Sequence, residues 1–378
     1  MNASLTIGTL TTKKFINKLL KQKSLTKENV RLKFYALVNE SKKAKTDLFF
    51  FSINDVNIKK LTIFGTYYNE EKKKWLQKNF PFPDVFYNQI ARGLDNPGRP
   101  FRQLRRKLME QGVTQLNSKN DFDKWELYKE LSKIEEVDPY LPRTKRFYEY
   151  EDLKNMIHAH PSVYVKSIHG RRGKAIMKII KDSPRGFRCL FYSSKLEIYK
   201  VDTLRKVLKI VKKFFGDKTL LIQQAINLSS YTNRIFDMRA EIQRDGRGNI
   251  RIAGIPVRVG QKDSPVTSSR TKSEIYPFET FFREKLGYSR REYRKLLKKV
   301  NLFLETVYKN TEKIYGPFGE LGIDFGLDQQ GRLWLIECNA TSGKKAFIQA
   351  YNEDTIMESK RVLLEYAKGL IDEKNDFP

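Results

Sequence analysis

Two acidic residues and one amide near the C-terminus have the types and spacing of a metal site. Asp324 and Glu337 each interrupt an apolar run, and Asn339 follows Glu337 by two positions. A carboxylate buried alone among apolar side chains either costs several kcal/mol or takes up a proton, so both acids are expected to face cations or hydrogen-bond donors. Two carboxylates and one amide oxygen form a hard donor set that suits Mg²⁺, with Mn²⁺ as the alternative.

A β-hairpin is the element that would bring these side chains together. Two apolar runs within residues 319–344 flank a glycine-containing turn at residues 328–331, which is typical of paired antiparallel strands. Side chains alternate between the faces of a strand, so Asp324 would lie beside its neighbouring glycines. By the same alternation, Glu337 would share a face with Leu333, Leu335 and Asn339. The competing interpretation, a solvent-facing strand pair with incidental acids, conflicts with the Ile, Phe, Leu and Trp around them.

The pattern G-I-D-x-G-x-D-x-x-G-x-x-W-L-I-E-x-N over residues 322–339 resembles the metal-binding hairpin of the ATP-grasp superfamily, most closely its YheC/YheD-type, spore-coat-associated branch. The thirteen-residue spacing from Asp324 to Glu337 and the E-x-N ending are specific in combination. The resemblance covers roughly residues 80–350. It implies an ATP-grasp fold of mixed α/β and α+β character, preceded by a small α/β domain.

Three parts are expected along the chain. They are an N-terminal α/β (pre-ATP-grasp) domain, residues 1–116, a small ATP-grasp subdomain with a glycine-rich lid loop, residues 117–226, and a large subdomain with the metal-binding hairpin, residues 227–378. One strand of the first part is expected at residues 30–38. In the third part, Ser289 and Glu292 form a capping box that opens a long predicted helix.

Two lysines on separate elements are candidates for binding nucleotide phosphates. Lys124 falls in the first turn of a helix that Asn120 or Asp121 would cap, where the residues alone indicate only a surface lysine. Lys166 lies in the predicted alternating strand S-V-Y-V-K-S-I. The resemblance implies that both lysines contact the phosphates of ATP.

A loop of glycines and basic residues follows Lys166. In H-G-R-R-G-K, residues 169–174, two glycines three apart can bring backbone N–H groups close to a phosphate. The same spacing is also that of an ordinary hairpin between two strands. The resemblance implies the flexible loop that closes over the β- and γ-phosphates, with contacts from Gly170, Arg172, Gly173 and Lys174.

The strand T-L-L-I-Q-Q-A-I-N, residues 219–227, leads into a candidate nucleotide-binding hinge. It resembles the family's interdomain hinge, in which backbone and side chains contact the adenine edge, so Gln223, Gln224 and Ile226 are expected to bind the base. Asn227 stands where relatives often carry an acid that binds ribose. An amide both donates and accepts hydrogen bonds, so a weaker ribose contact is expected from Asn227.

Two arginines are the candidate catalytic residues. Arg239 belongs to a D-x-R pattern with Asp237, and Arg258 lies across from it on the return strand of a predicted hairpin. The resemblance implies that the arginine of this pattern contacts the transferred phosphate or a carboxylate substrate. The planar guanidinium fork suits either group. The competing interpretation is a purely structural Asp–Arg pair.

Two segments depart from the family pattern. The loop at residues 266–274 lacks the Thr-Asn and Gly-Gly pairs that relatives usually carry, which leaves acceptor specificity and turnover open. After Asn339, the sequence A-T-S-G-K-K replaces the family's Ser-Lys-Pro-Gly-Arg. Gly343 and Lys344 are expected to keep its turn and its charge.

The composition adds a strong positive charge. A formal net charge of +29 raises the local concentration of polyanions, although a solvated basic surface gives the same count. Nucleic-acid binding therefore rests on charge alone. The sequence has no eighteen-residue apolar run and no signal-peptide pattern, which predicts no membrane span. Its two cysteines fit a reducing compartment, so a cytoplasmic protein is expected, with spore association implied by the resemblance.

Together these features predict an ATP-dependent, Mg²⁺-requiring ligase. It would join a carboxylate to an amine or related nucleophile through an acyl-phosphate, with an anionic peptide or polymer as substrate. The alternative is a non-catalytic spore-coat or polyanion-binding protein that retains the ATP-grasp fold.

Overall fold

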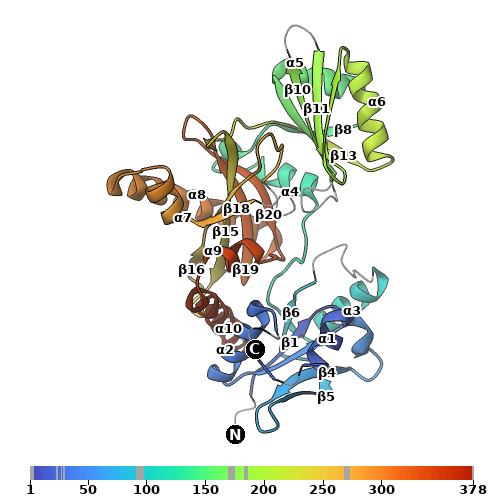
Figure 1. Cartoon of the computed structure of the whole chain (residues 1–378). Coiled ribbons are helices and arrows are strands. Elements are labelled where there is room, and N and C mark those ends of the chain that lie inside the picture. Colours follow the sequence, from blue (N-terminus) through green and yellow to red (C-terminus); the bar gives the residue numbers. More distant parts are fainter. Residues whose placement is uncertain are drawn as a thin grey trace.

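The computed structural model contains three β-sheets that follow one another along the chain. Figure 1 shows them stacked, with the N-terminal sheet at the bottom, the second sheet at the top and the third between them. The residues that the structure describes are 4–22, 24–26, 28, 30–90, 98–168, 175–182, 186–267 and 273–376. The architecture is the mixed α/β and α+β type expected from the sequence.

The N-terminal sheet combines parallel and antiparallel strands. Its elements are β1 (Thr6–Leu10), α1 (Lys13–Leu20), α2 (Leu32–Lys43), β2 (Asp47–Phe51), β3 (Val56–Asn57), β4 (Thr62–Asn69), β5 (Lys74–Pro81), β6 (Val85–Asn88), α3 (Arg99–Glu110) and β7 (Thr114–Gln115). The strands β2, β1, β6 and β7 run parallel, and β4 pairs antiparallel with β2 and β5.

The prediction of a strand at residues 30–38 is wrong, because most of this segment lies in helix α2. Phe34, Leu37 and Val38 recur at helical spacing, and all three are buried in the core that the N-terminal sheet shares with α1. The apolar run has the period of a helix and not that of a strand.

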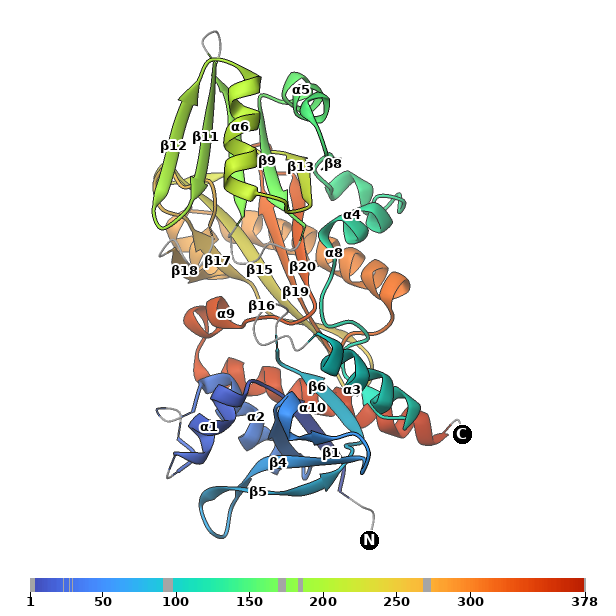
Figure 2. The same cartoon turned by 90° about the vertical axis from the view of Figure 1, so that its right-hand side faces the viewer.

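The second sheet is antiparallel throughout and is covered by two helices. Its elements are β8 (Thr144–Phe147), α5 (Tyr150–Ala159), β9 (Ser162–Ser167), β10 (Ile176–Asp182), β11 (Gly186–Tyr192), β12 (Leu196–Val201), α6 (Leu204–Phe215) and β13 (Leu220–Gln224). Figure 2 shows α6 lying along the strands. Val207, Val211 and Phe215 of this helix are buried in the same core as strand β9.

The third sheet carries the largest core and the predicted hairpin. Its elements are β14 (Ser230–Tyr231), β15 (Arg234–Arg244), β16 (Ile250–Gly254), β17 (Pro256–Val259), β18 (Glu274–Pro277), α7 (Phe278–Thr280), α8 (Arg290–Tyr315), β19 (Glu320–Leu327), β20 (Leu333–Asn339), α9 (Lys345–Ala350) and α10 (Glu353–Asp376). The predicted capping box of Ser289 and Glu292 is confirmed at the start of α8. Val300, Phe303 and Val307 of this helix pack against the sheet.

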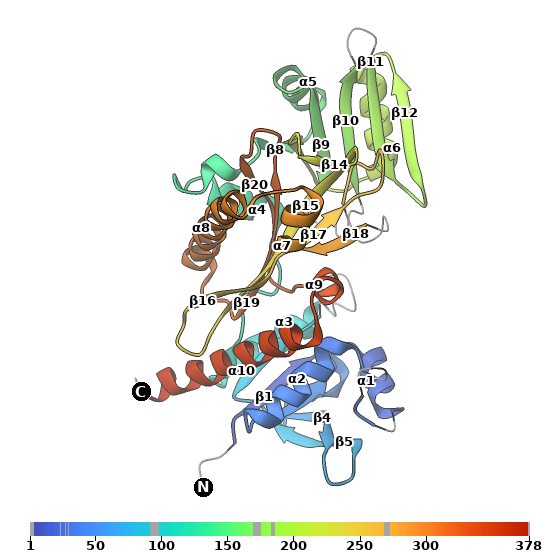
Figure 3. The same cartoon turned by 60° about the vertical axis from the view of Figure 1, so that its left-hand side comes forward.

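The hydrophobic cores follow the three expected parts of the chain only in part. Helix α4 (Lys124–Leu131) contributes Leu127 and Leu131 to the core of the third sheet rather than the second. Helix α10, at the far end of the chain, packs Leu363 and Leu364 into the N-terminal core. Figure 3 shows α10 lying across α2. The boundaries at 1–116, 117–226 and 227–378 stay a prediction.

The long helices α8 and α10 pack against two of these hydrophobic cores. Each packs apolar side chains into a sheet core, and Lys360 of α10 is buried as well, 3.7 Å from Glu320. Within the described ranges, none of the helices is both long enough and apolar enough to cross a lipid bilayer.

The predicted hairpin is confirmed, but the side-chain alternation in its second strand is not. Strands β19 and β20 pair antiparallel, with Asp324 opposite Glu337 and Phe325 opposite Leu335. Ile336 is therefore an extra residue in β20, a β-bulge that shifts the alternation by one position. The prediction that Glu337 shares a face with Leu333 and Leu335 is wrong: both leucines are buried in the core.

Candidate active site

A cavity of about 1640 Å³ lies where the three sheets meet. Its walls come from α1 and α2, from β9 and β13, and from the strands of the third sheet. Ten of the residues singled out in the sequence line it together: Lys124, Lys166, Gln223, Gln224, Ile226, Arg239, Arg258, Asp324, Glu337 and Asn339. Side chains separated by up to 215 positions in the chain thus face one space.

The remaining predicted site residues do not line the cavity or cannot be placed. Asn227 is exposed, donates a hydrogen bond to Gln329 Oε1 at 3.0 Å and does not line the cavity, so its contact with a ribose stays a prediction. Gly170, Arg172, Gly173 and Lys174 lie outside the described residues, and so does most of the divergent loop after Thr267.

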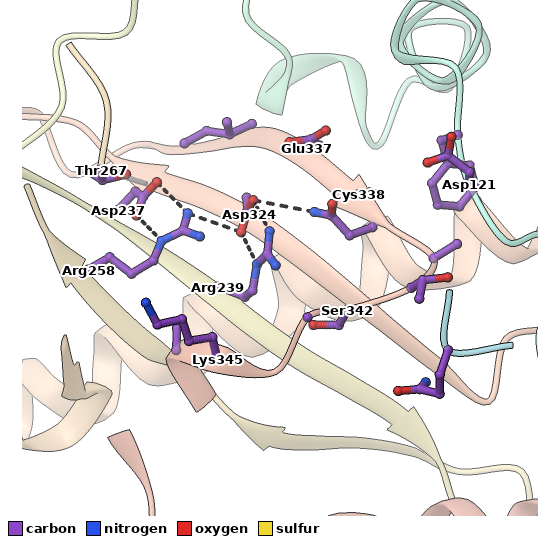
Figure 4. Close-up of a pocket in the computed structure, with 18 of the residues that line it drawn as sticks. Asp121, Asp237, Arg239, Arg258, Thr267, Asp324, Glu337, Cys338, Ser342 and Lys345 are labelled. Atoms are coloured by element: carbon purple, nitrogen blue, oxygen red, sulfur yellow. Dashed lines mark hydrogen bonds and ion pairs between the residues drawn. The ribbon is translucent and has the colours of Figure 1, made fainter. Parts of the chain in front are cut away.

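Asp324 lies at the centre of a network of two arginines and two aspartates on the floor of the cavity (Figure 4). Both nitrogens of the Arg239 fork donate to its carboxylate at 2.5 Å. Arg258 donates to both oxygens of Asp237, at 2.7 and 2.6 Å, and its Nη2 lies 3.2 Å from Asp324 Oδ1. The aspartates therefore fix the positions of the predicted site residues Arg239 and Arg258.

Burial and charge act in opposite directions on these acids. Burial by itself would raise the pKa of Asp324, but Arg239 and Arg258 hold that pKa below its ordinary value. Burial raises the pKa of Asp237, and Arg258 offsets only part of this effect. The side chains of both aspartates are 7% exposed, so their negative charges depend on the arginines.

Glu337 differs from Asp324 because its carboxylate is more open to the cavity. Its side chain is 33% exposed, and Lys124 Nζ lies 3.3 Å from its Oε1. Asn339 Nδ2 lies 3.5 Å from Asp324 Oδ2, so all three predicted metal ligands border the same space. Figure 4 shows Asp324 between Glu337 and Arg239.

This donor set fits a magnesium ion that shares oxygens with a phosphate. The described residues contain no group of three or more His, Cys, Asp or Glu side chains that could hold a metal by themselves. Mg²⁺ usually takes only one or two protein carboxylates and completes its shell with water and substrate phosphates. Two cross-strand carboxylates and an amide at the wall of a large cavity meet that requirement.

The helix that carries Lys124 begins at this residue. Asp123 is the N-cap, and its carboxylate accepts from the backbone N–H groups of Trp125 and Glu126. The prediction that Asn120 or Asp121 caps this helix is wrong. Asp123 leaves Lys124 as the first helical residue, directed at Glu337 of the hairpin.

Lys166 is held by the hinge strand rather than by an acid. Its Nζ donates to Gln223 Oε1 at 2.5 Å, and Gln223 Nε2 donates to Thr144 Oγ1 at 2.8 Å. Burial, with a smaller effect from Lys124, lowers the pKa of Lys166 to about 8. The side chain of Gln223 thus orients Lys166, and its predicted contact with an adenine edge stays a prediction. Gln224 Oε1 accepts a hydrogen bond from the backbone N–H of Arg143.

The two neighbouring lysines after the hairpin have different surroundings. Lys344 is 2% exposed and contacts Glu241 at 2.6 Å and Glu320 at 3.0 Å, away from the cavity. Lys345 is exposed and lines the cavity, and Figure 4 shows it on the side of Arg239 away from Glu337. The charge that the sequence assigned to Lys344 is thus offered to the cavity by Lys345. Two lysines in tandem give no signal of which one is buried.

The model of one protein family, described as YheC/D-like ATP-grasp, matches residues 112–370. Two curated proteins of Bacillus subtilis (strain 168) also match. The endospore coat-associated protein YheD is 25% identical over 354 residues, which cover 89% of this chain and 73% of YheD. The endospore coat-associated protein YheC is 21% identical over 299 residues, 79% of this chain and 81% of YheC.

Solved structures share the fold at low sequence identity. D-alanine–D-alanine ligase from Bacillus anthracis, complexed with ATP, superimposes with a TM-score of 0.55 at 11% identity, over 99% of this chain and 100% of the ligase. The ATP-grasp ligase PsnB, complexed with a minimal precursor, gives a TM-score of 0.54 at 11% identity, over 96% of this chain and 100% of PsnB. These similarities show the ATP-grasp fold.

Proposed function

The chain belongs to the YheC/D-like ATP-grasp family, and on that premise we propose that it is an ATP-dependent ligase. The observation that carries the proposal is the convergence of two lysines and three oxygen ligands on one cavity. Lys124, Lys166 and the hairpin residues come from three different elements and have no structural need to meet. A nucleotide triphosphate with its metal is the ligand that needs both sets together.

Asp324, Glu337 and Asn339 are the residues that would hold Mg²⁺. Bound Mg²⁺ would neutralise negative charge on phosphate oxygens during transfer. Glu337 is already available to a cation, because its only close partner in the described structure is the ammonium group of Lys124 at 3.3 Å. Asn339 would add a neutral oxygen beside the two carboxylates.

Lys124 and Lys166 would bind the phosphates from two sides. Lys166 reaches the cavity from β9 with its ammonium group steadied by Gln223, and Lys124 reaches it from the first turn of α4. Fixed positive charges of this kind need no reorganisation when charge develops on the transferred group. Gln223, Gln224 and Ile226 line the part of the cavity next to Lys166, where the base of the nucleotide would lie.

Arg239 and Arg258 would hold the second substrate at the γ-phosphate. In the proposed reaction a carboxylate oxygen attacks the γ-phosphorus, the bond to the β-phosphate oxygen breaks, and an acyl-phosphate and ADP form. An amine then attacks the acyl carbon and displaces inorganic phosphate, losing a proton. The guanidinium forks suit both the carboxylate and the transferred phosphoryl group.

Related ligases illustrate the reaction class. The matched structures include a D-alanine–D-alanine ligase with ATP and an ATP-grasp ligase with a minimal precursor. An anionic peptide or polymer is our proposal for the substrate here. The protein is proposed to act in the cytoplasm and to associate with the spore, as its relatives YheD and YheC are endospore coat-associated proteins.

A second candidate is a non-catalytic spore-coat protein that retains the fold. The observation that favours it is the loop at residues 266–274, which lacks the glycines that let a backbone approach a ligand closely. The two candidates differ in turnover, because only the ligase converts ATP to ADP.

ADP release in the presence of pooled carboxylic acids and amines tests the ligase proposal. Wild-type protein should release ADP with at least one pool, and Lys166→Met should abolish that release. Lys178→Met is the matched control, because Lys178 is a partly buried lysine of the same sheet that does not line the cavity. ATP binding without ADP release from any pool would favour the non-catalytic candidate, and absence of both would refute the proposal.

A further inference from the structure

The cavity is larger than a nucleotide requires. Small-molecule sites usually occupy about 300–1,000 Å³, whereas this cavity measures about 1640 Å³. The predicted nucleotide contacts occupy the side formed by β9, β13 and the hairpin. The opposite side, formed by the N-terminal domain and the segment after the hairpin, contains none of them.

That opposite side is basic. We define the basic wall as the cationic residues that line it: Lys14, Lys18, Lys21, Arg31, Lys33 and Lys345. The described residues of the N-terminal domain contribute no acid to the cavity lining. Within the described chain, no ion pair neutralises a member of the basic wall. The wall therefore presents a field that attracts an anion.

Helix α1 holds three of these charges on one face. Lys14, Lys18 and Lys21 follow the i, i+4, i+7 spacing that lines up side chains, while Phe15, Ile16 and Leu19 on the other face are buried in the core. Like charges at i, i+4 destabilise a helix by about 0.2–0.5 kcal/mol per pair. The stability of the fold thus gives no reason for this row of lysines, and ligand binding does.

Lys33 lies deeper in the wall and points to the same conclusion. It is partly buried, and its Nζ donates to Gln89 Oε1 at 2.8 Å. Burial and then Lys360 lower the pKa of Lys33 to about 7, although Glu320 acts in the opposite direction. An anion beside Lys33 would favour its protonated form.

We propose that the basic wall binds the second substrate of the ligase, and that this substrate is an acidic peptide segment with several carboxylates. The assignment rests on the proposed ligase function. Six basic residues spread over the N-terminal domain and the segment after the hairpin match carboxylates spaced along a chain, whereas one small acid would reach only one or two of them. A peptide also supplies the carboxylate or the amine that the reaction consumes.

Single-stranded nucleic acid is the other polyanion that the charge could attract. Proteins that bind it stack the bases on exposed aromatic rings. The aromatic residues on the N-terminal side of the cavity are Phe15 and Phe34, and both are buried in the core. The wall thus has the charge for carboxylates without the rings for bases.

Fluorescence anisotropy with a labelled ten-residue polyglutamate peptide tests the assignment, with saturating ATP and Mg²⁺ present. The cavity variant is Lys14→Glu with Lys18→Glu. Its control is Arg291→Glu with Lys295→Glu, an exposed pair at the same helical spacing on α8, outside the cavity. The cavity variant should weaken peptide binding about tenfold or more near 0.1 M salt, and the control less than about twofold. Lys345→Gln, in the segment after the hairpin, should weaken peptide binding by a smaller factor.

The outcomes separate this inference from the ligase proposal. Equal weakening by both double variants, or none in any variant, would overturn the basic wall as a subsite. Tighter binding of a ten-nucleotide RNA than of the peptide, lost in the cavity variant, would overturn the peptide assignment. A thermal shift with ATP and Mg²⁺ on the same samples reports on nucleotide binding, so its absence would count against the ligase proposal and not against the wall.

Discussion

Glu337 faces Asp324 across the hairpin because Ile336 is an extra residue in strand β20. Without this bulge, Glu337 would follow Leu333 and Leu335 onto the core face of the sheet. The bulge therefore does two things: it keeps the leucines in the core and turns the glutamate to the cavity. Bulges that re-aim one side chain are frequent beside active sites.

Truncating the bulge residue Ile336 and truncating its neighbour Leu335 should have different effects. Leu335→Ala should lower the free energy of unfolding by about 2–4 kcal/mol, because a buried side chain leaves a void in the core. Ile336→Ala should cost less stability and should change nucleotide affinity, since Ile336 lines the cavity. Urea unfolding and a nucleotide titration of each variant measure this contrast. Similar losses of stability in both would mean that the bulge does not separate the two faces.

The sequence was sufficient to predict the hairpin but not the bulge in its second strand. The turn residues 328–331 and the two apolar runs define two antiparallel strands, and both formed. A one-residue shift in register leaves those signals unchanged, because Ile336 is as suitable for a strand as its neighbours. Only the packing of Leu335 against the core and the pairing of Asp324 with Glu337 choose between the registers.

Glu337→Gln should remove most of the stabilisation by ATP and Mg²⁺ while leaving the fold intact, because it removes a charge and keeps the volume. A ligand that binds only the folded state stabilises it by about 2.7 kcal/mol at a hundredfold excess over Kd. Thermal unfolding with and without ATP and Mg²⁺ should show that shift in the wild type and little of it in the variant.

Glu305→Gln is the matched control for this change. Glu305 lies on α8 and pairs with Lys309 at 3.3 Å, the same separation as Glu337 and Lys124, but it does not line the cavity. Its variant should keep the full shift. If both variants lose the shift, or both keep it, Glu337 has no special part in binding the metal and nucleotide.

Nucleotide binding should weaken as the pH rises through about 8. Burial lowers the pKa of Lys166 from 10.5 to about 8 in the free protein, and phosphates bind the protonated form. The affinity is then at its highest below this pKa and falls above it, by up to tenfold for each pH unit. Isothermal titrations between pH 6.5 and 9.5 measure the profile, and Lys166→Arg should flatten it. A wild-type profile without this fall would exclude Lys166 as a phosphate ligand.

Long-range partners could not be predicted from local sequence. The sequence indicated which residues carry charge, but not that Gln223 accepts from Lys166 or that α10 closes the N-terminal core. Local patterns were decisive where neighbours in sequence are also neighbours in space, as in the capping box of Ser289 and Glu292. Where the partner is more than a hundred residues away, as for Lys344 and Glu241, only the folded chain shows it.

Exchanging each of the two neighbouring lysines after the hairpin should separate a structural charge from a binding one. Lys344 pairs with Glu241 and Glu320, which are 0% and 1% exposed. Lys344→Met would leave two buried carboxylates with too little positive charge. Breaking a buried ion pair in this way costs about 3–5 kcal/mol of stability. Burial alone would raise the pKa of Glu320, yet Lys344 and Lys360 hold that pKa well below its ordinary value.

The sign of the pH effect follows from that lowered pKa. A carboxyl group with a lowered pKa in the folded state stabilises it above the unfolded pKa, and this stabilisation is lost on acidification. The wild type should therefore lose stability below about pH 4.5, and Lys344→Met should be less stable at pH 7 with a weaker acid dependence. Lys345→Met, at an exposed position, should change the free energy of unfolding by less than about 0.5 kcal/mol. Guanidinium unfolding of both variants at pH 7 and pH 4 decides the matter, and equal stability of the two at pH 7 would show that Lys344 is not the lysine that neutralises the buried acids.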